Sequence, residues 1–152
     1  MDRSRACLAR ILPTTLDLAP ALDPRLPDEG ALYSYAILRA DLQMPPGKLA
    51  AQASHAHAQS LIAYLLRHPE HLSHFHDLGV SGTRIVLLAP HENALLRAYD
   101  QARQLDLPCA LFRDSGHILP PHFTGEPIIT ALGLGPAPRD ALRPITRRFS
   151  LA

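Results

Sequence analysis

Apolar runs of strand length alternate along this chain with segments of helical period, and this alternation restricts the fold more than any other feature. The apolar runs cover residues 33–39, 83–89, 108–112 and 127–134. The helical segments cover residues 47–67 and 91–105, and a last helix begins near Pro138 and is stopped or kinked at Pro144. The pattern predicts βαβ units, and therefore an α/β fold with a largely parallel sheet. Because such crossovers are right-handed, we expect helices on both faces.

Composition places the chain among globular proteins with one domain. It has 152 residues, of which 47% are hydrophobic and 19% charged. A formal net charge of +1 gives no basic excess of the kind that announces a nucleic-acid partner. The two cysteines, Cys7 and Cys109, make no disulfide framework, which favours a reducing cytoplasm. No apolar run reaches the length of a membrane span, so we expect no membrane association.

The regular fold is expected to begin at residue 32. Residues 1–31 carry four prolines that break any longer helix, so they are predicted to form an irregular arm without chemistry. Between the main elements, a short histidine-rich helix is predicted over residues 70–77 and a long loop over residues 113–126.

Charged residues follow two of the predicted strands where each strand ends. Arg39 and Asp41 come after the first strand, and Arg113 and Asp114 come after the third. In parallel sheets, ligands bind beyond the carboxyl ends of the strands, so this edge is the predicted site. The helix that begins after Gly47 should start beside the first pair.

Lys48 lies in the first turn of that helix and is the only lysine, beside fourteen arginines. An ammonium is a compact point charge with a tunable pKa, whereas a guanidinium is a planar fork with a fixed charge. With the free N–H groups of a helix start, Lys48 suits a phosphate or a developing oxyanion. The alternative is a solvated lysine after a proline-glycine turn.

Asp114 opens an Asp-Ser-Gly-His turn, and two interpretations have equal weight. Its carboxylate could act as a general base or position a water molecule. It could equally cap the N–H groups of its own turn, a common role of aspartate. A Ser-His-Asp hydrolase is poorly supported, since the chain has no Gly-x-Ser-x-Gly elbow.

Histidines offer a third candidate chemistry. His55 lies on the first long helix and could line the same edge, although a packed or surface histidine is the more common case. The cluster of His68, His71, His74 and His76 invites a metal interpretation, but we expect no acidic or cysteine ligands to accompany it at tight spacing. We therefore expect solvated histidines there, and no metal site.

Several motifs together resemble the type II peptidyl-tRNA hydrolases. They are Arg39-Ala-Asp41-Leu-Gln-Met44, Gly47-Lys48-Leu-Ala-Ala-Gln52-Ala-Ser54-His55-Ala56, Arg113-Asp114-Ser-Gly116 and Gly133-Leu-Gly135-Pro136. The resemblance covers residues 33–152. It implies a three-layer α/β/α domain over residues 32–152 with a four-stranded mixed, mostly parallel sheet. It also implies family homodimers and hydrolysis of the ester bond in peptidyl-tRNA without metal or cofactor.

The resemblance also assigns residues. The family's catalytic lysine and aspartate fall on Lys48 and Asp114, and a family threonine falls on Thr130. Substrate binding would fall to a larger set: Arg39, Asp41, Gly47, Gln52, His55, Arg113, Gly116 and His117.

Two departures from the family pattern keep other functions open. Pro45-Pro46 replaces a Gly-Lys pair, and His117-Ile118 replaces an Arg-Thr pair, so a second family threonine is missing. The competing hypotheses are a tRNA- or nucleotide-binding relative without strong hydrolase activity, and an adaptor that uses the fold for protein contacts.

Overall fold

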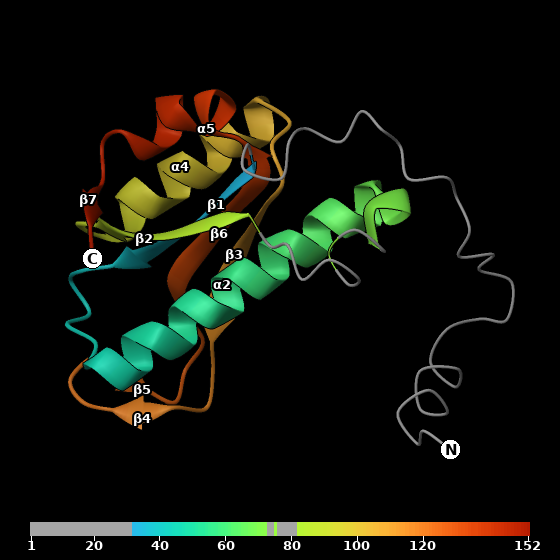
Figure 1. Cartoon of the computed structure of the whole chain (residues 1–152). Helices are drawn as coiled ribbons and strands as arrows, with labels where there is room; N and C mark the ends of the chain where they lie inside the picture. Colours follow the sequence, from blue (N-terminus) through green and yellow to red (C-terminus); the bar gives the residue numbers. More distant parts are fainter. Residues whose placement is uncertain (1–31, 73–74, 76–81) are drawn as a thin grey trace, which may run out of the picture.

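The structure, a computed structural model, describes residues 32–72, 75 and 82–152. Its elements in chain order are β1 (Leu32–Arg39), α2 (Pro46–Arg67), the 3-10 turn η2 (Pro69–His71), β2 (Thr83–Ala89), α4 (Glu92–Gln104), β3 (Cys109–Asp114), β4 (Ile118–Leu119), β5 (Phe123–Thr124), β6 (Ile128–Pro138), α5 (Arg139–Thr146) and β7 (Ser150–Leu151). Helix α2 lies on one face of the main sheet, and α4 and α5 lie on the other (Figure 1). The predicted three-layer α/β architecture is confirmed.

Within the described residues, the main sheet has five strands in the order β3-β6-β1-β2-β7. In it, β1 and β2 pair in parallel, whereas β6 pairs antiparallel with both β1 and β3, and β7 pairs antiparallel with β2. The expectation of four mostly parallel strands is therefore wrong in detail. The chain passes from β3 to β6 through a small β4/β5 hairpin instead of a crossover helix, so β6 returns in the opposite direction.

Three strands nevertheless run in one direction, because β6 lies between β1 and β3 and is antiparallel to both. The carboxyl ends of β1, β2 and β3 consequently share one edge of the sheet. This confirms the expectation that Arg39, Asp41, Arg113 and Asp114 emerge together. The start of α2 lies at the same edge, near the β4/β5 hairpin (Figure 1).

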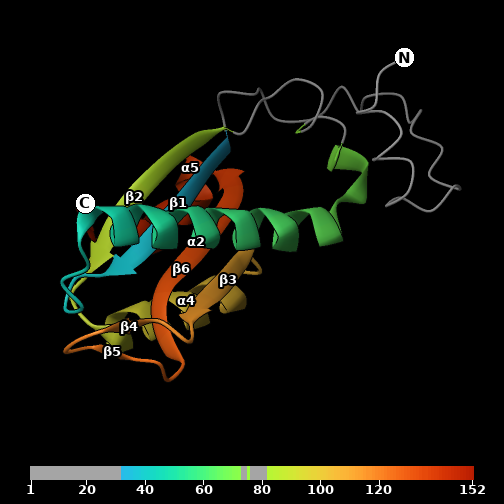
Figure 2. The ribbon, with the colours of Figure 1, turned by 90° about the horizontal axis from the view of Figure 1, so that it is seen from below.

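Side chains of β1 alternate between two hydrophobic layers. Tyr35 and Ile37 pack with α4 and α5, and Ala36 and Leu38 pack beneath α2. Figure 2 shows α2 lying across the strands, with β6 and β3 behind it and α4 on the far side. Burial of β1 on both faces explains its nearly continuous apolar sequence.

The inner face of α2 is built from small residues, as its alanines predicted. Ala53 and Ala56 are buried against the sheet. The approach is closest at Gly133 of β6, where an added Cβ would lie 2.0 Å from the Ala56 carbonyl oxygen. No other residue type fits there unless the helix moves.

Several predictions outside the core need correction or cannot be placed. The loop predicted over residues 113–126 contains the β4/β5 hairpin, and β7 was missed because only two residues pair. Pro144 lies inside α5, which continues to Thr146. The arm of residues 1–31, and residues 73–74 and 76–77 of the helix predicted over 70–77, lie outside the described residues. Among the described helices, none is both long and apolar enough to span a membrane.

Gly133→Ala tests the close contact between α2 and β6. We expect the free energy of unfolding to fall by about 3 kcal/mol, because overpacking against backbone atoms forces the helix away from the sheet. Urea denaturation measures this change. Gly47→Ala is the matched control, since an added Cβ there meets nothing within 4 Å; equal stability of both variants would contradict the contact.

His57 of α2 gives the fold a pH dependence. Its side chain is buried, and its Nδ1 atom has no hydrogen-bond partner among the described residues. Burial, with a smaller contribution from Arg84, lowers the pKa of His57 from 6.5 to about 4. Between pH 6.5 and about pH 4, His57 is protonated in the unfolded chain but stays neutral in the folded chain. The free energy of unfolding therefore falls as the pH drops through this range.

We expect this effect to cost about 2 kcal/mol of unfolding free energy between pH 8 and pH 5. Urea denaturation at both pH values should show the loss in the unaltered chain and a smaller loss in His57→Leu. His122→Ala, which removes an exposed histidine, should keep the full loss. An unchanged pH dependence in His57→Leu would show that His57 does not cause it.

Candidate active site

Lys48 and Asp114 meet at the shared edge of the sheet. Lys48 extends from the first turn of α2, and Asp114 is the last residue of β3. The lysine Nζ atom forms an ion pair with Asp114 Oδ2, and each side chain is 12% exposed. Among the described residues, Asp114 accepts hydrogen bonds from Lys48 and Gln52 and none from its own turn. The geometry thus favours the functional interpretation of Asp114 over the turn cap.

Gln52 connects this ion pair to the interior. It follows Lys48 by one helical turn, and its Nε2 atom donates to Asp114 Oδ2 at 3.0 Å. Its Oε1 atom accepts a hydrogen bond from the hydroxyl of Thr130 on β6. Thr130 has an exposed fraction of 0%, so its hydroxyl orients the Gln52 amide and is closed to a large ligand.

Both donors to Asp114 use the same carboxylate oxygen, Oδ2. The other oxygen, Oδ1, has no hydrogen-bond partner within the described part of the chain. An ionised carboxylate has about four acceptor sites, so Oδ1 can accept a further hydrogen bond. The carboxylate is therefore held firmly on one side and remains available on the other.

The β4/β5 hairpin packs beside Lys48 through an aromatic side chain. The ammonium lies 4.7 Å from the centre of the Phe123 ring, which is buried. His117 contacts the same ring edge-on, with the two ring centroids 5.6 Å apart, so His117 adjoins the site through Phe123. Gly116 has φ +75° and donates its N–H to the Gly125 carbonyl oxygen, which closes the hairpin. Phe123 carries no local sequence signal and was missed.

Arg39 organises a second group of charges at the edge. It donates to both carboxylate oxygens of Asp41, to Glu92 Oε2 at 2.5 Å and to the Ile129 carbonyl oxygen at 3.0 Å. The hydrogen bonds and the charge of Arg39 lower the pKa of the Asp41 carboxyl. Arg39 is buried, and its guanidinium is held by two carboxylates and a carbonyl oxygen, an arrangement suited to positioning. Glu92 was missed, although it opens the helix that follows β2 at this edge.

The remaining candidates lie at the surface around this edge. His55 is exposed on α2, and its ring stacks on Phe112 with centroids 4.4 Å apart. Gly47 and Arg113 are exposed, at the start of α2 and near the end of β3. The structure therefore brings Lys48, Gln52, Asp114 and Thr130 into one network, with the other candidates outside it.

Three strands whose carboxyl ends share one edge, with the Lys48–Asp114 ion pair at that edge, define an α/β protein with a charged site at the edge of its sheet. The family described as peptidyl-tRNA hydrolase PTH2 matches residues 32–152. The chain belongs to this family.

Named relatives from animals and archaea agree with this assignment. The human protein called peptidyl-tRNA hydrolase 2, mitochondrial, is 34% identical over 128 residues, which cover 83% of this chain and 67% of the relative. A peptidyl-tRNA hydrolase of Methanococcus vannielii is 33% identical over 79% of this chain and 99% of its own length. One from Staphylothermus marinus is 33% identical over 76% of this chain and 90% of its own.

Proposed function

We propose that this protein hydrolyses the ester bond of peptidyl-tRNA, releasing free tRNA and peptide, at the network around Lys48 and Asp114. The observation that carries the proposal is the half-buried ion pair between these residues, one of which is the only lysine of the chain. Family membership supplies the substrate class. The pair supplies a base and a cation within reach of one ester.

In this mechanism, Asp114 Oδ1 accepts a proton from the attacking water, while Oδ2 stays bound to Lys48 and Gln52. The water oxygen adds to the ester carbonyl carbon, and negative charge develops on the carbonyl oxygen. The Lys48 ammonium and the free N–H groups at the start of α2 stabilise that charge. Collapse of the intermediate breaks the bond to the ribose oxygen, which takes the proton that Asp114 accepted from water, so the carboxylate is regenerated.

Thr130 and Gln52 serve this mechanism as positioning residues. The buried Thr130 hydroxyl donates to Gln52 Oε1, which turns the amide so that its N–H faces Asp114. Two donors on Oδ2 restrain the orientation of the Asp114 carboxylate. The hydroxyl therefore acts through Gln52, although the family resemblance implied a catalytic role.

Recognition of the tRNA is supported by exposed groups near and away from the ion pair. Near it, the exposed His55 ring, backed by Phe112, offers a stacking surface for a base or ribose. On the opposite face of the sheet, Arg139, Arg143 and Arg147 recur every four residues and line a cavity of about 590 Å³. None of these three arginines forms an ion pair with a carboxylate of the described residues, so they suit backbone phosphates.

A tRNA- or nucleotide-binding relative without strong hydrolase activity is the second candidate. It is favoured by Ile118, which occupies the position of a family threonine and is 72% exposed on the hairpin. Cleavage and binding must therefore be measured separately.

Location and assembly are further parts of the proposal. A cytoplasmic location rests on the cysteine usage, whereas the human and bovine relatives carry the word mitochondrial in their names. Homodimeric assembly rests on the family resemblance alone.

Lys48→Ala and Asp114→Asn test the proposed chemistry on a defined peptidyl-tRNA. We expect kcat to fall about 100- to 1,000-fold for Lys48→Ala, because one oxyanion donor is lost. Asp114→Asn removes the base, so we expect its kcat to fall by about 100-fold or more. Single-turnover release of labelled peptide measures both effects, and circular dichroism confirms that each variant folds.

Equilibrium binding to the same tRNA separates the two candidate functions. Hydrolysis by the unaltered chain with loss in both variants supports the enzyme. Tight, salt-sensitive binding without cleavage by any form supports the binding relative, because phosphate contacts impose a steep salt dependence. Full turnover by Lys48→Ala would overturn the proposed mechanism.

Thr130→Val tests the positioning role. Valine keeps the buried shape but removes the donor to Gln52, so we expect kcat to fall about tenfold while KM stays within about twofold. Thr130→Ser should restore most of kcat because it restores the hydroxyl. A change confined to KM, or no difference between valine and serine, would exclude the role of the hydroxyl.

A further inference from the structure

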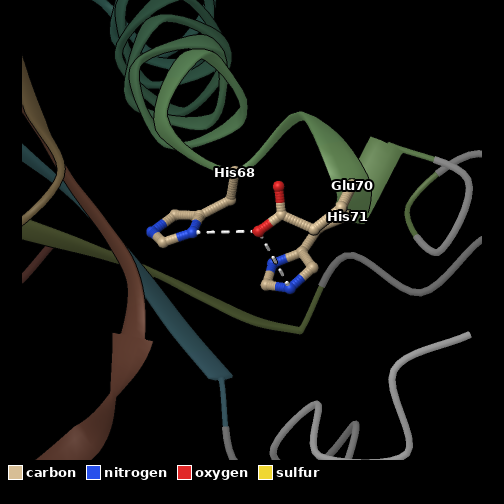
Figure 3. Close-up of side chains that lie close together, drawn as sticks. All are labelled: His68, Glu70 and His71. Carbon is tan, nitrogen blue, oxygen red and sulfur yellow. Dashed lines mark hydrogen bonds and ion pairs between the residues drawn. The ribbon is translucent and has the colours of Figure 1, made fainter. Parts of the chain in front are cut away.

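Three potential metal ligands converge at the end of α2 that lies farthest from Lys48. His68 follows the last helical residue, and Glu70 and His71 lie on the 3-10 turn η2. One donor atom from each lies within 4.8 Å of the other two. Figure 3 shows the Glu70 carboxylate directed between the two imidazole rings.

The sequence pattern predicts solvated histidines in this segment because no acidic ligand is counted beside them. Glu70 supplies that ligand, and the turn that begins at Pro69 brings it between the histidines on either side.

The distances between Glu70 and the two histidines resemble the separations of ligands around a metal ion, and they are longer than those of strong ion pairs. Glu70 Oε1 lies 3.4 Å from His68 Nδ1 and 3.8 Å from His71 Nε2. Good charge-assisted hydrogen bonds are shorter, at about 2.7–2.9 Å. Around a tetrahedral Zn²⁺ with bonds of about 2.0–2.1 Å, neighbouring donor atoms lie about 3.3–3.4 Å apart. The two Glu70 distances are within about 0.5 Å of this spacing. The two imidazole nitrogens, within 4.8 Å of each other, would approach further to complete a coordination shell.

His71 is already oriented by a neighbour in the way that metal-binding histidines usually are. Its Nδ1 atom lies 2.7 Å from the hydroxyl of Tyr64, a buried residue one helical turn before His68. In the tautomer that suits a metal, Nδ1–H donates to the hydroxyl and the lone pair of Nε2 faces Glu70. A hydrogen bond to the second ring nitrogen fixes both ring orientation and tautomer in such sites.

We propose that His68, Glu70 and His71 bind a divalent transition-metal ion, with Zn²⁺ as the best match to two imidazoles and one carboxylate. Three protein ligands leave a fourth position for water. The site lies about 30 Å along α2 from Lys48, by the rise of an α-helix. It is independent of the proposed ester hydrolysis and joins the end of α2 to the turn that follows.

Zn²⁺ alone is the probe, added to untagged, metal-stripped full-length protein in isothermal titration calorimetry. We expect one ion per chain, a proton release at pH values where the histidines are partly charged, and a higher Tm with Zn²⁺ than with EDTA. Co²⁺ in place of Zn²⁺ should give a visible absorption band that reports its coordination.

Glu70→Gln and His71→Ala should each raise the Kd for Zn²⁺ at least tenfold. Tyr64→Phe, which keeps the ring but removes the hydroxyl, should weaken binding about tenfold or more. His122→Ala controls for the histidine count, and it should bind Zn²⁺ normally. Hydrolysis of peptidyl-tRNA should be the same with and without Zn²⁺, so failure of the metal site and failure of the hydrolase mechanism remain distinguishable.

Absence of Zn²⁺ binding in the unaltered chain would overturn the proposal. Equal affinity in the unaltered chain, Glu70→Gln and His71→Ala would also overturn it, because the ion would then bind elsewhere. Circular dichroism of each variant confirms that a lost affinity is not lost folding.

Discussion

The contact between the backbone of α2 and Gly133 of β6 is the constraint on which the rest of the site depends. At that point the Ala56 carbonyl oxygen occupies the space that a side chain on β6 would need. Gln52 lies one turn earlier on α2, and Lys48 lies one turn before Gln52. The contact at Gly133 therefore sets the distance of both residues from the sheet. A helix held farther away could not place Gln52 between Thr130 and Asp114, which come from two different strands.

Two cations at the edge, Arg39 and Lys48, are paired with carboxylates of the protein. Arg39 binds Asp41 and Glu92, and Lys48 binds Asp114. A low net charge of +1 is therefore compatible with strong local fields at the site, because these paired charges are held in place. Fixed charges in a half-buried site need little reorganisation when a reaction changes the charge of the substrate. The net charge of the chain does not indicate whether such a site is present. Positive charge can also be concentrated on one face, as the arginines of α5 show.

Sequence periodicity was sufficient for the α/β class, the extents of β1, β2 and α4, and the edge at which charged residues gather. It could not supply the direction of β6, because the paired segments of β4 and β5 are two residues long and have no measurable period. Contacts across the chain were also out of reach: Gln52 and Thr130 are 78 residues apart, and Phe123 resembles any other core aromatic. Glu70 was visible beside the histidines, but only the turn after Pro69 shows that it faces both of them.

The single lysine has a consequence for chemical modification. In most proteins, reagents directed at amines spread over many lysines, and their effects are averaged over the surface. Here the only side-chain amine belongs to the half-buried ion pair with Asp114. Acylation of that amine would remove its charge and leave the carboxylate without its cation. The chain thus has a single side-chain site for amine acylation, and this site is Lys48, the residue proposed to stabilise the charge that develops on the reacting ester.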